Sequence, residues 1–168
     1  MSERSPAPGG LALIESLVNT LDIEAGADAL DSAEERARLG LTEEELPGAR
    51  ELRESLRAAL LAHAGHPPHG PVTPLGELLA RAPLVVTVDP SDGSAALAAS
   101  DTGPLLARVA AAVAQSLVDG TWTRLKACEA TTCHWAYYDR SPAGRGRWCS
   151  MQVCGARAKM RRYRAAKD

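Results

Sequence analysis

The stretch from Cys128 to Cys154 reads CEATTCHWAYYDRSPAGRGRWCSMQVC and contains all four cysteines of the 168-residue chain. Four residues separate Cys128 from Cys133 and Cys149 from Cys154, and a loop of 15 residues joins the two pairs. Two closely spaced cysteine pairs joined by such a loop are a usual way to close a tetrahedral zinc shell. Because thiolates prefer a borderline-soft cation, Zn²⁺ is favoured over calcium or magnesium. The sequence therefore predicts a zinc ion held by four thiolates.

Other uses of the cysteines and nearby histidines stay open at this point. An iron–sulfur cluster or a regulatory dithiol also uses clustered thiols, and four unrelated buried cysteines are a further alternative. His134 could replace one sulfur, but adjacent ligands are geometrically awkward, so we expect it outside the shell or facing solvent. His63, His66 and His69 lie in or beside a loop rich in proline and glycine and are expected to be solvated. A four-thiolate shell leaves no position for a substrate, so the predicted metal is structural.

The formal net charge of −2 hides an uneven distribution along the chain. Residues 1–120 contain 8 basic and 18 acidic side chains, whereas residues 121–168 contain 11 basic and 3 acidic ones. An asymmetry of this size indicates two parts with different partners, and the basic part suits polyanions. We therefore divide the chain into a flexible N-terminus (1–9), a helical domain (10–120) and a cysteine-containing module (121–168) too short to fold on apolar burial alone.

Apolar residues recur at helical spacing through much of residues 10–120. Asp31 with Glu34, and Thr42 with Glu45, have the spacing of a capping box and predict two helix starts. The expected helices are 11–21, 31–40, 42–60, a short one after Pro74, and 104–120. The β-branched run 84–88, the turn residues 89–93 and the segment 94–100 predict one β-hairpin. The fold class is therefore mainly α with a small β-hairpin (α+β).

Neither a secretory signal nor a membrane span is expected. Residues 1–10 contain one arginine and no apolar core, and the most apolar later stretch, 109–118, is interrupted by Gln115 and Ser116. Spanning a bilayer takes about 20 apolar residues. We therefore expect a soluble, cytoplasmic protein with no membrane partner. Thiols stay reduced in that compartment, which favours metal binding over disulfides.

The residues after Cys154 predict a strongly basic helix, and the loop between the cysteine pairs adds further arginines. Positions 157, 161 and 164 share one helical stripe, with 159 and 162 on the adjacent side. Such side chains bind phosphate oxygens, and arginine can also read guanine edges in a major groove. The alternative is a solvated or protein-facing helix whose cations suit its dipole. The candidate nucleic-acid contacts are Arg140, Arg145, Arg147, Arg157, Lys159, Arg161, Arg162 and Arg164.

All six aromatic residues of the chain lie after residue 120. Aromatic rings can stack on bases in a nucleic-acid interface. A module of this size, however, has little else that is apolar. We therefore expect most of these rings to form a small core around the metal.

Three segments together resemble a known family: Tyr138-Asp-Arg-Ser141, Arg147-Trp-Cys-Ser-Met151, and Cys154-Gly-x-Arg-x-Lys159. With the cysteine spacing, they resemble the CGNR-type zinc finger. That family places this finger after a helical ABATE domain and is described as bacterial stress-induced transcription regulators. The segment 11–21, LALIESLVNTL, is similar to the opening of that domain, which typically ends in Asn-Thr. The resemblance implies a mainly helical N-terminal domain with a small β element, and a C-terminal DNA-binding finger.

Two positions depart from the family pattern. Ala156 stands where the name of the finger requires Asn, and Leu17 stands where an aromatic residue usually precedes Val-Asn-Thr. The departure at Ala156 leaves the cysteines intact, so it bears on the start of the last helix and not on metal binding.

The leading hypothesis is a zinc-dependent DNA-binding regulator. Its acidic helical domain would either sense a small molecule or mediate self-association as a homodimer, since one small finger gives modest specificity. The second hypothesis is a zinc-stabilised adaptor that binds RNA or an acidic protein surface without sequence-specific DNA binding. An enzyme is not expected, because the chain has no Ser-His-Asp arrangement, P-loop or glycine-rich nucleotide motif. Glu15, Asp22 and Glu24 are then the solvated face of a helix.

Overall fold

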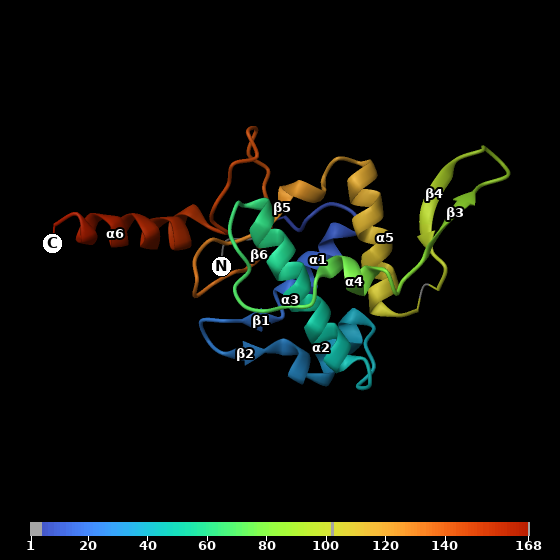
Figure 1. The fold of residues 1–168 in the computed structure, drawn as a ribbon, viewed down its shortest axis with the longest axis horizontal. Helices are drawn as coiled ribbons and strands as arrows, with labels where there is room; N and C mark the ends of the chain where they lie inside the picture. The colour runs from blue at the N-terminus through green and yellow to red at the C-terminus, as the bar shows by residue number, and fades with distance from the viewer. Residues whose placement is uncertain (1–4, 102, 168) are drawn as a thin grey trace.

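The computed structural model of the protein describes residues 5–101 and 103–167. It is mainly helical with small two-stranded sheets, which confirms the predicted fold class (Figure 1). The helices are α1 (Leu11–Val18), α2 (Ala33–Leu39), α3 (Leu46–His63), α4 (Leu75–Leu79), α5 (Leu105–Val118) and α6 (Ala156–Ala165). The strands are β1 (Leu21–Asp22), β2 (Ala27–Asp28), β3 (Leu84–Val88), β4 (Ala95–Ala99), β5 (Leu125–Ala127) and β6 (Ala136–Tyr138). The three sheets are antiparallel pairs of consecutive strands: β1–β2, β3–β4 and β5–β6.

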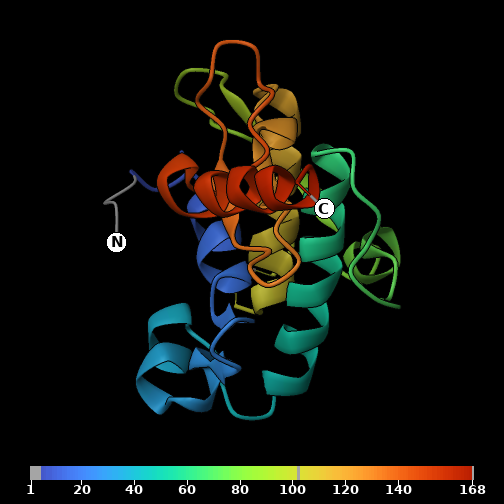
Figure 2. The ribbon, with the colours of Figure 1, turned by 90° about the vertical axis from the view of Figure 1, so that its left-hand side faces the viewer.

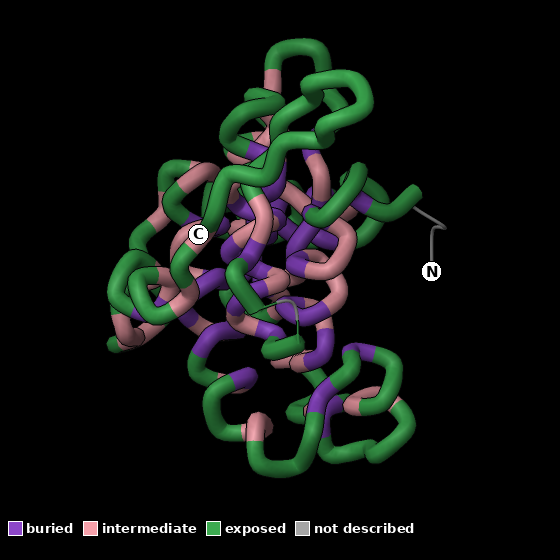
Figure 3. Tube along the Cα trace, turned by 90° about the vertical axis from the view of Figure 1, so that its right-hand side faces the viewer, coloured by how far each residue is buried: buried purple, intermediate pink, exposed green. Residues whose placement is uncertain are grey.

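Helices α1, α3 and α5 pack against one another and enclose the main core (Figure 2). Each presents an apolar stripe, because residues three and four apart fall on one face of a helix. Buried residues gather at the centre of the molecule, and the peripheral loops are exposed (Figure 3). Within the described residues, no helix is both long and apolar enough to cross a membrane. Fully buried aliphatic residues of this core include Leu11, Ile14, Leu17, Leu30, Leu56, Leu60, Leu61 and Val109.

The two predicted capping boxes do not begin their helices as expected. Helix α2 begins at Ala33 and follows Ser32, not Asp31. The N–H of Thr42 does donate to the carboxylate of Glu45 at 2.9 Å, but α3 begins only after Glu45. In both places the sequence located the helix and misplaced its first turn.

The first helix ends at Val18, earlier than expected, because the chain turns back through β1 and β2. The carboxylate of Asp22 accepts a hydrogen bond from the N–H of Ala25 at 3.0 Å. Gly26 follows with φ of +65°, which glycine adopts without a Cβ clash. This hairpin escaped prediction because two-residue strands carry no detectable alternation.

The hairpin predicted over residues 84–100 is confirmed as β3 and β4. Val85 pairs with Ala98 and Val86 pairs with Leu97. The hairpin projects from the helical body, and most of its residues are exposed (Figure 1).

The hairpin β5–β6 shares the main core with the helices. Its buried residues in that core are Leu125, Ala127 and Ala136. Trp122 and Tyr138 pack against the same core, whereas Trp148 packs against the cysteines. Tyr163 of α6 is exposed, so at most three of the six rings lie around the cysteines, and the expectation that most aromatic residues surround the metal is wrong. The helical body supplies the apolar surface that the short hairpin lacks.

The side chain of Asn19, directly after α1, joins that helix to β6. Its amide nitrogen donates to the carbonyl oxygen of Ala136 at 3.0 Å, and its amide oxygen accepts from the N–H of Ala136 at 2.7 Å. One side chain thus satisfies both backbone groups of a strand residue, as a neighbouring strand would. The next residue, Thr20, is buried and accepts a hydrogen bond from Arg53 of α3 at 3.1 Å.

The segment expected to be flexible, 1–9, is only partly described. Residues 1–4 lie outside the described residues. Ala7 is buried, and its N–H donates to the carboxylate of Glu15 at 2.7 Å. The later part of this segment therefore lies against α1.

Replacing Asn19 with Leu should lower the free energy of unfolding of the zinc-loaded protein by about 2–6 kcal/mol. The substitution leaves the N–H and C=O of Ala136 without their partners, and each unsatisfied buried group costs about 1–3 kcal/mol. Urea denaturation followed by circular dichroism measures this change. Ser16→Ala, on the same helix, is the matched control and should change stability by less than about 0.5 kcal/mol. Equal stability of Asn19→Leu and the control would contradict the inferred role.

Candidate metal centre

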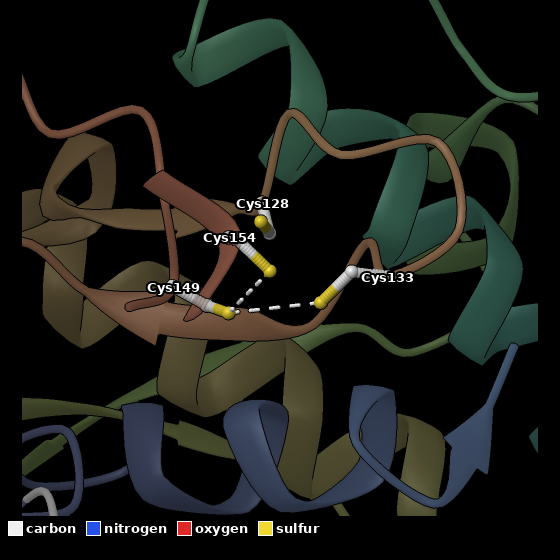
Figure 4. Close-up of side chains that lie close together, drawn as sticks. All are labelled: Cys128, Cys133, Cys149 and Cys154. Carbon is white, nitrogen blue, oxygen red and sulfur yellow. Dashed lines mark hydrogen bonds between the residues drawn. The ribbon is translucent and has the colours of Figure 1, made fainter. Parts of the chain in front are cut away.

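The four cysteine sulfurs converge on one point, as the spacing predicted (Figure 4). All of them lie within 4.8 Å of one another. The Sγ atoms of Cys133 and Cys149 are 3.6 Å apart, and those of Cys149 and Cys154 are 3.7 Å apart. All four are free thiols.

The sulfur positions fit a zinc ion. A zinc–sulfur bond of about 2.3 Å in a tetrahedron places neighbouring sulfurs about 3.8 Å apart. The separations of 3.6 and 3.7 Å are close to that value, whereas a disulfide needs about 2.05 Å. Four thiolates are a soft donor set, which suits zinc and fills the four positions of its tetrahedral shell.

Four clustered thiols cannot all ionise without a compensating cation. Hydrogen bonds from Cys133 and Cys149 lower the pKa of Cys128, and the hydrogen bond to Cys128 raises the pKa of both partners. Burial raises the pKa of Cys154. Because like charges this close together oppose one another, metal binding must displace protons from the cluster.

The first cysteine pair lies on a tight turn that continues the β5–β6 hairpin. The N–H of Cys128 donates to the carbonyl oxygen of Trp135 at 2.9 Å, which extends the ladder by one pair. The N–H groups of Cys133 and His134 both donate to the carbonyl oxygen of Ala130, at 2.8 and 3.1 Å. His134 has φ of +48°, a left-handed conformation that reverses the chain after the ligand.

The second pair lies where the chain enters α6. A π-helical turn over Met151–Gly155 follows Ser150, whose hydroxyl accepts a hydrogen bond from the N–H of Val153 at 3.3 Å. A Cβ at Gly155 would lie 3.0 Å from the sulfur of Met151, so this close approach favours glycine. Ala156, where the finger family has Asn, is exposed at the first position of α6.

His134 lies outside the group of candidate ligands, as expected, but it does not face solvent. It is 8% exposed, and its ring packs 5.8 Å from the ring of His69. Its carbonyl oxygen accepts a hydrogen bond from Arg57 of α3 at 2.8 Å. The expectation of a solvated His69 is also only partly correct, because His69 bonds Glu54 at 2.9 Å.

The buried guanidinium of Arg57 holds the turn that follows Cys133. Besides His134, it donates to the carbonyl oxygen of Val18 at 2.9 Å and pairs with Glu54 at 3.0 Å. The sequence analysis missed this residue. The periodicity of α3 offered a signal, because an arginine at an inward position of an apolar stripe needs partners.

The loop between the cysteine pairs is held by a buried ion pair that the sequence analysis also missed. Lys126 and Asp139 are 3.0 Å apart, and their side chains are 5% and 4% exposed. Burial alone would raise the pKa of Asp139, but hydrogen bonds from Ser141, Lys126 and Gly146 hold it well below its ordinary value. This carboxylate fixes both ends of the 141–146 segment.

Three of the eight predicted nucleic-acid contacts already have partners within the protein. Arg140 donates to two carbonyl groups of the N-terminal segment at 3.1 and 2.7 Å. Arg147 pairs with Glu129, and Arg157 pairs with Glu24 at 2.8 Å. These contacts leave them less available to a ligand than their charge suggests.

The other five predicted contacts are exposed. Helix α6 lies outside the helical body, and Ala158 is its buried residue (Figures 1 and 2). Within residues 5–101 and 103–167, the side chains of these five make no hydrogen bond or ion pair. They are Arg145, Lys159, Arg161, Arg162 and Arg164.

The helical body and the closed four-thiolate cluster together define a zinc-finger protein. Residues 124–167 match the family model of the CGNR zinc finger. Residues 11–120 match the ABATE family model, whose description is "Putative stress-induced transcription regulator". The chain therefore belongs to the ABATE family and carries a CGNR zinc finger at its C-terminal side. A comparison with curated proteins finds no match.

The purified protein should contain one zinc ion per chain, with all four thiols protected until a chelator is added. Cys154→Ser should lower the zinc content well below one and remove the helical circular dichroism signal of α6, because an isolated helix of this length is marginal in water. Metal analysis measures the zinc content, a thiol titration measures the protection of the cysteines, and circular dichroism measures the helical signal. Thr132→Ser, between the first two cysteines, should retain the full zinc content. Freely reactive thiols without chelator would refute the site.

Proposed function

We propose that the protein is a DNA-binding transcription regulator in the cytoplasm that acts by binding and catalyses no reaction. Its zinc ion orders the C-terminal section, and α6 contacts the DNA. The acidic helical domain (10–120) senses a ligand or mediates self-association. The observation that carries this proposal is the exposed basic face of α6, which begins two residues after the zinc ligand Cys154.

The dimensions of α6 support insertion into DNA. A helix of 10 residues at about 1.5 Å per residue is roughly 15 Å long, and the major groove of about 12 Å admits a helix. Arg161 and Arg164 share one stripe, and Arg162 lies on the adjacent side. These side chains can neutralise phosphates, and those nearest the groove floor can reach base edges.

The distribution of charge supports contact through the C-terminal section alone. The net negative charge of residues 1–120 disfavours contact with a polyanion, whereas the net positive charge of residues 121–168 attracts one. A single α6 makes few contacts, so a homodimer would be needed to read two half-sites.

An adaptor that binds protein or RNA is the second candidate. It is favoured by two apolar side chains on α6, since Met160 is 51% exposed and Tyr163 is 56% exposed. A protein surface would bury such side chains, and Tyr163 could stack on an unpaired base. Competition between duplex DNA and single-stranded RNA separates this candidate from the first.

Fluorescence anisotropy with a labelled duplex across a salt series tests the proposal. Each phosphate contact contributes about −0.9 to the slope of log K against log salt concentration. Arg161→Ala and Arg164→Ala should each make that slope shallower by about 0.9, unless the residue reads only bases. Arg81→Ala removes an exposed arginine of the helical domain and should leave the slope unchanged. No affinity for duplex DNA at low salt, or equal effects of the three variants, would exclude the DNA-binding role of α6.

A further inference from the structure

A cleft of about 840 Å³ lies between α1, the β1–β2 hairpin and the cysteine cluster. Its volume falls in the range of about 300–1,000 Å³ that small-molecule sites occupy. The wall combines Trp135 and Val153 with polar side chains of α1 and with Asn19, directly after that helix. Three of the four zinc ligands, Cys133, Cys149 and Cys154, also line it.

The charged groups of this cleft leave an excess of negative charge. Both arginines in the wall already have partners. Arg38 donates to Glu35 at 2.8 Å, and Arg157 donates to Glu24 at 2.8 Å.

Two further carboxylates in the wall have no cationic partner among the described residues. Glu15 accepts from the N–H of Ala7 at 2.7 Å, and Asp22 accepts from the N–H of Ala25 at 3.0 Å. Each carboxylate has further acceptor capacity, since an ionised carboxylate offers about four lone-pair sites. Both residues are half-buried. Salt therefore screens their attraction to a cation less than it would at an open surface.

We propose that this cleft binds a small organic cation, with its ammonium or amidinium group paired to Glu15 and Asp22 and its apolar part against Trp135. A zinc ion with four thiolates carries net negative charge, which adds to the attraction. An anion is disfavoured because both arginines are engaged. A bare inorganic cation would leave most of the volume and the aromatic wall unused. An aromatic ring beside a cation adds attraction through its quadrupole.

The rim of the cleft connects this site to α6. Glu24 lines the cleft and pairs with Arg157, the first basic residue of α6. A bound cation that attracts Glu24 would release Arg157 for a phosphate and tighten DNA binding. This regulatory step rests on the proposed function, whereas the binding site does not.

The site is tested by titrating zinc-loaded, ¹⁵N-labelled full-length protein with 2-phenylethylammonium, followed by NMR. Saturable shifts are expected at the Asn19 side-chain amide and the Trp135 indole. Glu15→Gln and Asp22→Asn should each weaken the apparent affinity at least about threefold, because each removes one charge-assisted hydrogen bond. Spectra of the free variants, compared with the wild type, establish that each is folded, and the second variant replaces the first if one is not.

Glu77→Gln removes the same charge from the exposed face of α4 and should leave the affinity unchanged. The anion 3-phenylpropanoate has a similar shape and should cause no saturable shift at either reporter. Absence of saturation with the cation, equal response to the anion, or equal weakening by Glu77→Gln would each overturn the proposal.

Anisotropy with the labelled duplex, with and without saturating 2-phenylethylammonium, tests the regulatory step separately. The cation should tighten DNA binding of the wild type, and Glu24→Gln should tighten it without the cation. Unchanged DNA affinity in both experiments would overturn the regulatory step. A protein that binds the cation but no DNA would refute the proposed function and leave the site standing.

Discussion

The guanidinium of Arg57 connects the helical body to the backbone that presents the cysteines. Its side chain is 0% exposed and contacts the ends of two separate structures, the carbonyl of Val18 after α1 and the carbonyl of His134 after a zinc ligand. Burial lowers the pKa of Arg57, and Glu54 opposes that effect. A buried charge that loses a partner costs about 3–5 kcal/mol, so the position of this group is strongly fixed. The metal site therefore has a fixed place relative to α1 and α3, and α6 departs from that place.

The zinc ligands and the main helices could be predicted because their information is local. Cysteine spacing reports ligand geometry directly, and the stripes of α1, α3 and α5 repeat over several turns. The contacts that join the two parts could not be predicted, because each depends on one pair of residues far apart in the chain. Asn19 bonds Ala136 across 117 residues, and Arg57 bonds His134 across 77. The short strands of β1–β2 and β5–β6 were missed for the opposite reason, since two or three residues are too few to show a period.

Charge counting found the basic section but did not separate free cations from engaged ones. Arg157, Arg161 and Arg164 are equivalent on a helical wheel. Arg157 lies nearest the body and meets a carboxylate from the turn between β1 and β2, whereas the other two extend beyond its reach. The same logic applies to Arg147, because Glu129 faces it from the first cysteine turn. The position of a cation relative to the folded body decides its availability, and periodicity alone carries no information on it.

The attachment of α6 to the body combines one strong connection and one weak connection. The thiolate cluster fixes the start of the helix, and a four-thiolate shell offers no open position at which a ligand could exchange. The ion pair between Arg157 and Glu24 is about half exposed on both sides, at 50% and 57%, and such exposed pairs contribute little to stability. Loss of so weak a contact leaves the thiolate cluster and its connection to α6 in place. The regulatory step proposed above would therefore act at this ion pair, where the helical domain, the metal site and the basic helix meet.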